Sequence, residues 1–393
     1  MTRVALVHDW LTGFRGGERV LAALCEMYPS AEIFTLVHVE GSCGPSIESR
    51  PITTSFLQRL PGALTNYRHY LPLFPLAIER LDLAGFDLVV STSHAVAKGC
   101  RPARGALHVA YVHTPMRYAW DQFDAYFGPG RAGIATRLAA RLAMPALRRW
   151  DVRSTARAHG IVANSRFVAG RCERFWGRAV DAIVYPPVDT DRFVPEAATP
   201  STGRGGYALL VSALVPYKRV DLAVRTFSRL GRRLVVAGGG PELGRLRALA
   251  GSTVEVRGPV PPDELPALQA GASFFVLPGV EDFGIAPVEA QAAGRPVLAL
   301  GQGGALETVV SPEQARAQGI AATGCFFDSA TEESLAAGIA RMDALMPSID
   351  PARVRAHALR FSAGRFRGAL AAAIAAVAVR RGRAELADLA QLG

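Results

Sequence analysis

The chain has 393 residues, half of them apolar, and its 39 glycines and 26 prolines are not gathered into a low-complexity block. This length and composition are typical of a globular enzyme with two domains, each with its own buried core. Five scattered cysteines lack metal-ligand spacing and are expected to be buried thiols. The longest aliphatic run, Ala369–Val379, is far shorter than the ~20 residues that a membrane span needs.

The formal net charge of +10 comes almost entirely from arginine, because Lys98 and Lys218 are the only lysines. The segment Arg131–Arg178 holds 11 arginines and two acidic residues. A patch of this kind suits anionic lipid, a phosphorylated acceptor or nucleic acid, and a solvated helix face explains it equally well. Nucleic acid is the weakest of these interpretations, because the segment's helix offers few aromatic residues besides Trp150.

Short apolar runs alternate with helical patterns through the first half, which predicts parallel strands joined by helices. The predicted strands are Val4–Val7, Glu32–Leu36, Leu88–Ser91, Val109–His113 and Ile161–Asn164. The predicted helices are Glu18–Met27, Ala132–Arg157 and Arg166–Trp176. Ser165 is expected to cap the last of these helices.

A stretch rich in Pro, Gly, Ser and Thr, residues 195–206, predicts a linker, and the alternation restarts after it. The predicted strands are then Tyr207–Ser212, Arg233–Ala237, Val254–Arg257 and Ser273–Leu277, with helices at Val220–Leu230, Glu242–Ala250 and Asp263–Ala270. We therefore expect an α/β protein with two Rossmann-like parallel-sheet domains, residues 1–194 and 195–350, facing across a cleft. A helical tail, residues 351–393, follows them.

The most informative segment runs from Glu281 to Glu289, between the strand that ends near Leu277 and the next helix. Ligands of parallel α/β sheets bind beyond the carboxyl ends of the strands. Glu281 is expected in the loop there and Glu289 about one turn into the helix, where both can face one ligand. Between them, residues 283–285 (Phe, Gly, Ile) bring backbone N–H groups to the helix start, where anions and hydroxyls are held. The arrangement suits a phosphorylated sugar.

Two features of the first half occupy equivalent strand ends. Gly16 and Gly17 lie between the first strand and the first helix, where glycine lets the backbone approach a ligand closely. His113 ends the strand Val109–His113 and precedes a Pro-containing loop. A lone histidine is more often structural, but this position favours a function.

Lys218 and Arg219 also lie between a strand and a helix, and two cations at a ligand-binding edge suit a diphosphate that gains charge as it leaves. A surface charge at a helix start is the alternative. Asp189 and Asp191 have no supporting histidine or third acid nearby, so they are interpreted as turn residues. We predict no metal site.

Together, the spacing of Glu281 and Glu289, the Lys218 loop, the pair Gly16 and Gly17, and His113 followed by Thr-Pro resemble the retaining glycosyltransferases of family 4, which have the GT-B fold. The likeness covers essentially the whole chain. His8-Asp-Trp and the string from residue 215 to residue 222 look like a bacterial branch, often mannosyltransferases of O-antigen or exopolysaccharide assembly.

The resemblance implies that the second domain binds a nucleotide sugar and the first an acceptor, a glycan or a polyprenyl-diphosphate-linked sugar. It implies that Glu281 and residues 283–285 bind donor-sugar hydroxyls, that Glu289 binds the ribose hydroxyls and that Lys218 binds the diphosphate. It places His113 near the donor sugar, Gly16 and Gly17 near the phosphates, and the last helix back on the first domain. GDP-mannose is the expected donor, with no cofactor.

One position departs from the family pattern. The family usually carries an arginine five residues before the lysine, and this chain has Ala213 there, so Arg219 or an arginine of the first domain would have to supply that charge. Two alternatives stay open: a nucleotide-sugar epimerase of the same fold, and a non-catalytic module that binds a sugar nucleotide or a polyanion. We expect a cytoplasmic protein and leave open its peripheral contact with an anionic membrane.

Overall fold

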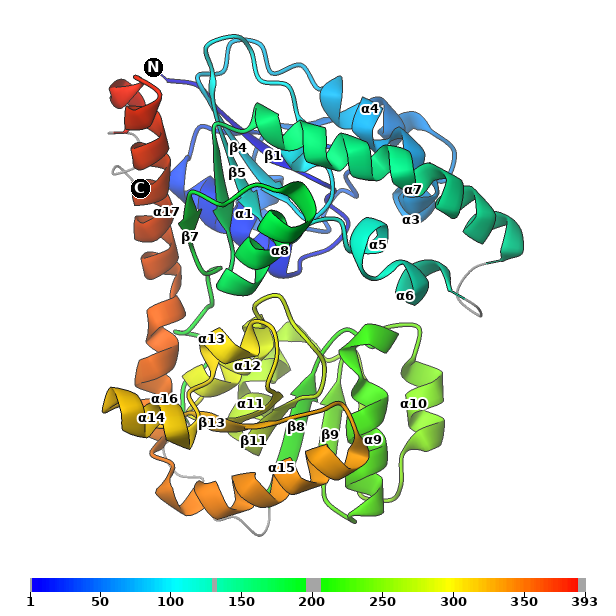
Figure 1. The fold of residues 1–393 in the computed structure, drawn as a ribbon, viewed down its shortest axis with the longest axis vertical. Helices are drawn as coiled ribbons and strands as arrows, with labels where there is room; N and C mark the ends of the chain where they lie inside the picture. The colour runs from blue at the N-terminus through cyan, green and yellow to red at the C-terminus, as the bar shows by residue number, and fades with distance from the viewer. Residues whose placement is uncertain (1, 129–132, 196–205, 388–393) are drawn as a thin grey trace. The chain divides into compact units, whose positions relative to one another are not determined.

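The computed structural model describes residues 2–128, 133–195 and 206–387, which form two compact units. The first unit is Met1–Pro187 with Gly364–Gly393, and the second is Val188–Ala363. Each unit is a parallel sheet with helices on both faces (Figure 1). The α/β class expected from the alternation of strands and helices is confirmed for both halves of the chain.

The first sheet has seven strands in the order β3-β2-β1-β4-β5-β6-β7, all parallel. Its strands are β1 Val4–His8, β2 Glu32–Thr35, β3 Ile52–Thr54, β4 Leu88–Ser93, β5 Leu107–Val112, β6 Gly160–Ala163 and β7 Ala182–Ile183. The predicted strands are all present with ends shifted by one or two residues, whereas β3 and β7 were not predicted. Strands β1, β4 and β5 are buried along their whole length.

The helices of the first unit cover its sheet on both faces. One face packs on α1 Gly16–Met27 and α17 Ala363–Arg380, and the other on α4 Phe74–Glu79, α7 Ile134–Ser154 and α8 Arg166–Trp176. Shorter helices are α2 Pro45–Glu48, α3 Ala63–Asn66, α5 Arg117–Trp120 and α6 Phe123–Phe127, with 3₁₀ turns η1 Phe56–Arg59, η2 Tyr67–Leu73, η3 Ala97–Gly99 and η4 Thr155–Arg157. Ser165 caps α8 as predicted, because its side chain accepts the N–H of Val168 at 3.0 Å.

The helix α17 belongs to the first unit although it lies at the end of the chain (Figure 1). Its Phe366, Leu370 and Ile374 are buried with residues of β1, β4 and α1. A Cβ atom at Gly160 would lie 2.4 Å from Val377 Cγ2, so a glycine is needed there for α17 to pack this closely on β6.

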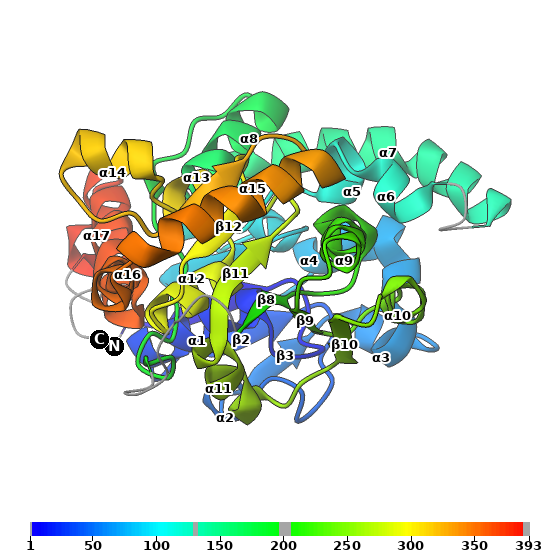
Figure 2. The same cartoon turned by 90° about the horizontal axis from the view of Figure 1, so that it is seen from below.

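The second sheet has six parallel strands in the order β10-β9-β8-β11-β12-β13. They are β8 Tyr207–Val211, β9 Leu234–Ala237, β10 Val254–Gly258, β11 Ala272–Leu277, β12 Val297–Leu300 and β13 Gly324–Phe327. One face packs on α9 Val220–Arg229, α10 Leu243–Leu249 and α15 Glu332–Leu345, and the other on α11 Leu265–Ala270, α12 Ile285–Ala292 and α13 Ala305–Thr308. In both views α15 runs beside α9 (Figure 1, Figure 2). The remaining helices are α14 Pro312–Gln318 and α16 Pro351–Ala358, with 3₁₀ turns η5 Pro216–Lys218, η6 Pro262–Glu264, η7 Met346–Ser348, η8 Leu359–Phe361 and, in the first unit, η9 Ala384–Leu386.

The predicted boundaries after residues 194 and 350 differ from those of the two units, because both flanking segments pack within the second unit. Val188 N donates to Phe361 O at 2.9 Å, and Arg355 of α16 donates to the carbonyls of Thr190 and Ala292 at 3.2 and 2.8 Å. These contacts tie the two segments to α12. Most of the predicted linker, residues 196–205, lies outside the described residues.

Candidate functional site

Three histidines meet at the carboxyl edge of the first sheet. His8 ends β1, His94 follows β4 and His113 follows β5, and β4 pairs with both of the other strands. The ring centroids of His8 and His94 are 5.9 Å apart and those of His94 and His113 are 6.2 Å apart. We call these three side chains the imidazole cluster. The sequence predicted a site role for His113 alone.

Asp9 holds the loop that carries His94. Its buried carboxylate accepts the backbone N–H groups of four successive residues, 94 to 97, at 2.7–2.9 Å. Its Oδ2 also lies 3.1 Å from His94 Nδ1. Burial by itself would raise the pKa of Asp9, but the charges of His94 and His8 and these N–H groups hold it below its ordinary value. Asp9 therefore fixes both the backbone and the ring of His94.

Glu18 supports the cluster from the first turn of α1. Its Oε1 lies 3.8 Å from His8 Nε2, and its Oε2 accepts the backbone N–H of Arg15 at 3.0 Å. Burial would raise the pKa of Glu18, but the contact with His8 outweighs burial and lowers the pKa to about 2. On its other side, His8 Nδ1 contacts Thr92 Oγ1 at 2.6 Å. Glu18 and Thr92 thus orient His8 from two directions.

His113 presents an imidazole nitrogen beside a glycine. Burial, with smaller contributions from the charges of His94 and His8, lowers the pKa of His113 to about 3, so its ring is neutral at neutral pH. Its Nε2 is buried and has no hydrogen-bond partner among the described residues. A Cβ atom at Gly17 would lie 3.7 Å from this nitrogen and 3.4 Å from His8 Cε1. Gly17, next to Gly16 at the start of α1, therefore keeps the space over both rings unfilled.

The second unit joins a lysine and a glutamate at its own carboxyl edge. The loops after β8 and β11 are neighbours because these strands pair, and they carry Lys218 and Glu281. Lys218 Nζ forms an ion pair with Glu281 Oε1, and both side chains are largely buried. A Cβ atom at Gly279 would lie 2.7 Å from Lys218 O, so the two loop backbones pack directly on each other. The sequence predicted both residues, and the structure brings them together as the charged pair.

Arg219 points elsewhere. Arg219 lies between η5 and α9. Its φ of 52° makes it the only non-glycine residue with positive φ among the described residues. Its Nε lies 3.6 Å from Asp221 Oδ1, and its Nη2 donates to Ala330 O at 3.3 Å. The guanidinium is therefore already engaged by Asp221 and Ala330 within the second unit.

The helix α12 begins where the sequence placed it, and Gly284 precedes it with a φ of 91°. Backbone N–H groups of Phe283, Gly284 and Ile285 lie at this helix start, and the Phe283 ring packs on Phe361 at 5.5 Å between centroids. Glu289 lies one turn into α12 and is 4% exposed. The start of a helix carries positive partial charge and suits an anionic or hydroxylated ligand.

A glycine loop supports Glu281 from the next strand. Gly304 N donates to Glu281 O at 2.8 Å, and a Cβ atom at Gly303 would lie 2.5 Å from that same oxygen. Any side chain at Gly303 would push the loop away, and its φ of 68° also favours glycine. The loop backbone is therefore fixed by close packing. A cavity of about 530 Å³ lies elsewhere in this unit, between α14, β13 and α15, and none of the predicted site residues lines it.

Asp189 acts as a turn residue, as predicted, because its Oδ1 accepts the N–H of Arg192 at 3.3 Å. Among the described residues, no group of three or more His, Cys, Asp and Glu side chains is arranged to hold a metal ion.

All five cysteines are free and buried, which confirms their interpretation as buried thiols. In the described part of the chain, none of the helices has the length and hydropathy that crossing a membrane requires.

The partners of His113 were not predicted from the sequence. His8, Asp9, Glu18 and His94 were assigned no role, although each stands at or just beyond a predicted strand or in a predicted helix start. The signal was their common position after strands β1 and β4. Only the strand order shows that these ends are adjacent.

Two family models match the chain in succession. The model described as Glycosyltransferase Family 4 matches residues 14–192, and the model described as Glycosyl transferases group 1 matches residues 196–344. Together they cover most of the chain and both of its parallel sheets.

Curated relatives match over part of their length. A GDP-mannose-dependent alpha-(1-6)-phosphatidylinositol monomannoside mannosyltransferase of Mycobacterium tuberculosis is 39% identical over 171 residues, which cover 37% of this chain and 44% of that protein. A D-inositol 3-phosphate glycosyltransferase of Acidothermus cellulolyticus is 32% identical over 237 residues, 52% of this chain and 50% of that protein. The chain thus matches half or less of the length of these relatives.

Solved structures share the fold along nearly the whole chain. Anabaena HepE in complex with UDP and glucose superposes with a TM-score of 0.64 at 17% identity, covering 96% of this chain and all of that one. Starch synthase IV of Arabidopsis thaliana bound to ADP and acarbose gives a TM-score of 0.62 at 13% identity, covering 95% and 99%. The two Rossmann-like parallel-sheet units are those of the GT-B fold, and the chain belongs to the glycosyltransferases of family 4.

Proposed function

We propose that the protein is a retaining, metal-independent glycosyltransferase that moves a sugar from a nucleotide diphosphate to a glycan or lipid-linked acceptor in surface polysaccharide synthesis. Mannose from GDP-mannose is the proposed donor, because the relatives matched at 36–39% identity are GDP-mannose-dependent enzymes. The proposal includes peripheral contact with an anionic membrane, where a lipid-linked acceptor would be found.

The observation that carries this proposal is the charged pair beside the start of α12. When a glycosyl group leaves a nucleotide diphosphate, negative charge grows on the phosphate while the sugar becomes positive. Lys218 and the N-terminus of α12 supply positive charge for the phosphate, and Glu281 supplies a carboxylate for sugar hydroxyls. The pairing of Lys218 with Glu281 holds both groups in place before a donor arrives.

The remaining residues take the roles that the resemblance implies. Glu289, one turn into α12, is proposed to accept hydrogen bonds from ribose hydroxyls, and the backbone at 283–285 to donate to the sugar. Arg219 is the weaker diphosphate candidate, because Asp221 and Ala330 already engage its guanidinium. The roles predicted for His113, Gly16 and Gly17 at the donor stay predictions.

Donor binding is the first test of the proposal. Isothermal titration of GDP-mannose, UDP-glucose and ADP-glucose into the protein should give measurable heat with at least one of them and strongest binding for GDP-mannose. A donor also raises the melting temperature in proportion to the logarithm of its concentration over Kd. If none of the nucleotide sugars binds, the glycosyltransferase proposal fails.

Acceptor dependence is the second test, and it separates a transferase from an epimerase. With labelled GDP-mannose and a bacterial membrane fraction as the acceptor source, a transferase should move the label into lipid or polysaccharide and release GDP. An epimerase would convert the donor without any acceptor. The anomeric configuration of the isolated product, determined by NMR, decides whether the reaction retains configuration, and activity in a chelator decides its metal independence.

A further inference from the structure

The long helix α7 has an apolar stripe that faces away from the core. Ile134, Leu138 and Leu142 are 90%, 59% and 74% exposed, and their spacing of four residues places them on one face of the helix. The opposite face packs into the core through Ala140, Met144 and Leu147. The core of the first unit therefore leaves the outer stripe uncovered.

Positive charge accompanies this stripe. The helix carries arginines 137, 141, 148, 149 and 153. Its single acidic residue, Asp151, is buried and lies 2.8 Å from Lys98 Nζ. Within the described residues, no carboxylate pairs with Arg141, Arg149 or Arg153. Residues 129–132, and with them Arg131 of the predicted basic segment, lie outside the described residues.

A cavity of about 520 Å³ lies on the same helix, one to three turns beyond Leu142. It is lined by Trp120, Ala146, Arg148, Arg149, Val152 and Arg153. The Arg148 guanidinium lies 5.7 Å from the centre of the Trp120 ring. The Nε of Arg148 also donates to Ala119 O, so its guanidinium is held at the edge of the cavity. Together with Arg149 and Arg153, it surrounds an apolar floor, which suits a single phosphate group attached to an apolar molecule.

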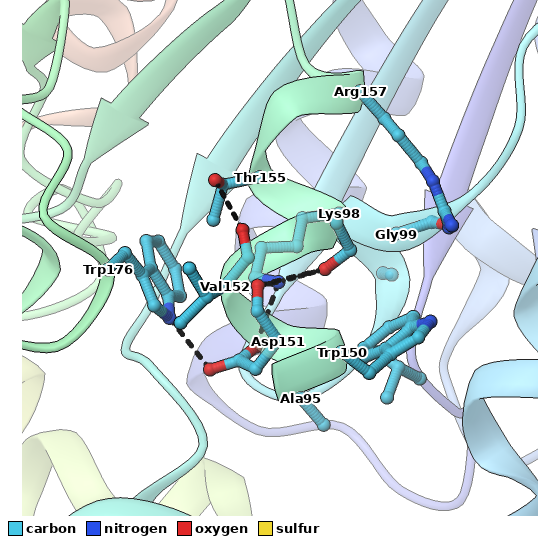
Figure 3. Close-up of polar contacts among 12 residues, drawn as sticks. Ala95, Lys98, Gly99, Trp150, Asp151, Val152, Thr155, Arg157 and Trp176 are labelled. Carbon is cyan, nitrogen blue, oxygen red and sulfur yellow. Dashed lines mark hydrogen bonds and ion pairs between the residues drawn. The ribbon is translucent and has the colours of Figure 1, made fainter. Parts of the chain in front are cut away.

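The C-terminal turns of α7, which line the cavity, are anchored within the first unit. Lys98 contacts Asp151, and the indole N–H of Trp176 donates to Asp151 Oδ2 at 2.7 Å (Figure 3). Lys98 Nζ also donates to Ser154 Oγ at 2.6 Å. The indole N–H of Trp120 donates to the same oxygen at 2.7 Å. This network ties α7 to η3 and α8 within the first unit.

We propose that the outer face of α7 docks on an anionic lipid bilayer, with Ile134, Leu138 and Leu142 among the acyl chains and the three-arginine cavity around a lipid headgroup phosphate. An interfacial helix needs this combination of apolar side chains and cations. A second copy of the chain fits less well. A two-fold symmetric contact through this face would bring the arginines of both copies together. The inference rests on the proposed function, because it specifies the surface that brings the enzyme to a lipid-linked acceptor.

The test is co-sedimentation of the full-length protein with vesicles, without any nucleotide sugar. Binding is expected to vesicles of equal parts phosphatidylglycerol and phosphatidylcholine and not to phosphatidylcholine alone. Leu138→Ser/Leu142→Ser should weaken the partition at least about tenfold, since two partly inserted leucines are lost. Arg149→Gln/Arg153→Gln should weaken it roughly 30-fold at low salt, at about 1 kcal/mol per cation.

Matched variants away from α7 test whether the loss of any exposed apolar side chain or arginine weakens vesicle binding. Leu230→Ser/Val379→Ser removes two exposed apolar side chains, and Arg316→Gln/Arg353→Gln removes two exposed arginines, in each case away from α7. Both controls should bind vesicles like the wild type. All four variants should bind GDP-mannose equally in calorimetry, which separates the membrane surface from the proposed transferase activity.

The proposal that α7 docks on a membrane would be wrong if the wild type did not bind anionic vesicles, or if the α7 variants bound them as well as the controls do. It would also be wrong if the protein bound inorganic phosphate but no vesicles. A concentration-dependent dimer in light scattering that the Leu138→Ser/Leu142→Ser variant abolishes, with no vesicle binding, would assign the face to a second copy of the chain.

Discussion

The carboxyl edges of the two sheets share one architecture and differ in how they hold their functional side chains. In the first unit, buried carboxylates hold the imidazole cluster: Asp9 accepts four backbone N–H groups and Glu18 contacts His8. In the second unit, glycines at 279, 303 and 304 let loop backbones pack closely and thereby place the charged pair. One edge is organised by hydrogen bonds to buried charge, and the other by backbone contact.

This difference predicts that substitutions at the first edge mainly lower stability, whereas substitutions at the second edge mainly lower ligand binding and turnover. Removing a buried carboxylate of the first edge leaves several donors without a partner, so the cost should fall on stability. Removing a member of the charged pair leaves the glycine-packed loops in place, so the cost should fall on ligand binding and turnover.

The largest effect is expected from Asp9→Ala. The change orphans four backbone N–H groups and His94, and breaking a buried pair of this kind costs about 3–5 kcal/mol of unfolding free energy. All four tryptophans, at positions 10, 120, 150 and 176, belong to the first unit, so fluorescence during urea unfolding reports that unit alone. The fluorescence midpoint should fall steeply.

A matched exposed carboxylate provides the control. Asp343 forms a two-bond ion pair with Arg232 at 2.6 and 2.8 Å, but both side chains are 41% exposed. Asp343→Ala should therefore cost about 1 kcal/mol or less, measured by far-ultraviolet circular dichroism. Equal losses for the two variants would contradict the view that the first edge depends on buried charge.

The next largest effect should come from Lys218→Ala in the second unit. Losing the cation that offsets charge on the leaving diphosphate is expected to lower turnover about a hundredfold or more, roughly 3 kcal/mol of barrier. The fold should stay intact by circular dichroism, because Gly279 still packs on the backbone of residue 218. Arg219→Ala, whose guanidinium Asp221 already engages, should cost less than tenfold. Unchanged turnover in Lys218→Ala would remove this lysine from the mechanism.

Acid should act on the first edge through Glu18. The folded pKa of Glu18, about 2, lies below its ordinary value of 4.5, so its contribution to stability is complete above about pH 4.5 and is lost as pH falls towards 2. That contribution is about 3 kcal/mol. Tryptophan-detected unfolding over this pH range should show the wild type and Glu18→Gln converging as pH falls. Parallel curves would show that the contact with His8 does not lower the pKa of Glu18.

The sequence predicted the helices and strands better than it predicted which strand ends lie side by side. Long apolar alternation placed most of the strands, and the predicted strand ends put Lys218 and Glu281 in the loops that the structure brings together. The short strands β3, β7 and β13 were missed because each has only two to four residues, and the short helices between residues 45 and 79 were missed because prolines interrupt them. The helix α15 was not predicted either. The partners of His113 were missed because their adjacency depends on the order β1-β4-β5, which no local pattern encodes. For α7, helical periodicity predicted a helix but could not show which of its apolar stripes the core would bury.

The smallest of these effects is expected from Glu289→Ala. If this carboxylate accepts a hydrogen bond from a ribose hydroxyl, its loss should weaken GDP binding about tenfold or more in calorimetry, since one hydrogen bond to a charged group is worth roughly 1.5–3 kcal/mol. Glu289→Gln keeps an acceptor of the same shape and should recover part of that loss. Glu313→Ala, at an exposed position on α14, should bind GDP like the wild type. Because Glu289 is itself buried, the melting temperature of the ligand-free variants must be compared as well. Wild-type GDP affinity together with a lowered melting temperature would make Glu289 a structural residue of α12, and the charged pair would then remain as the donor-binding feature of the second edge.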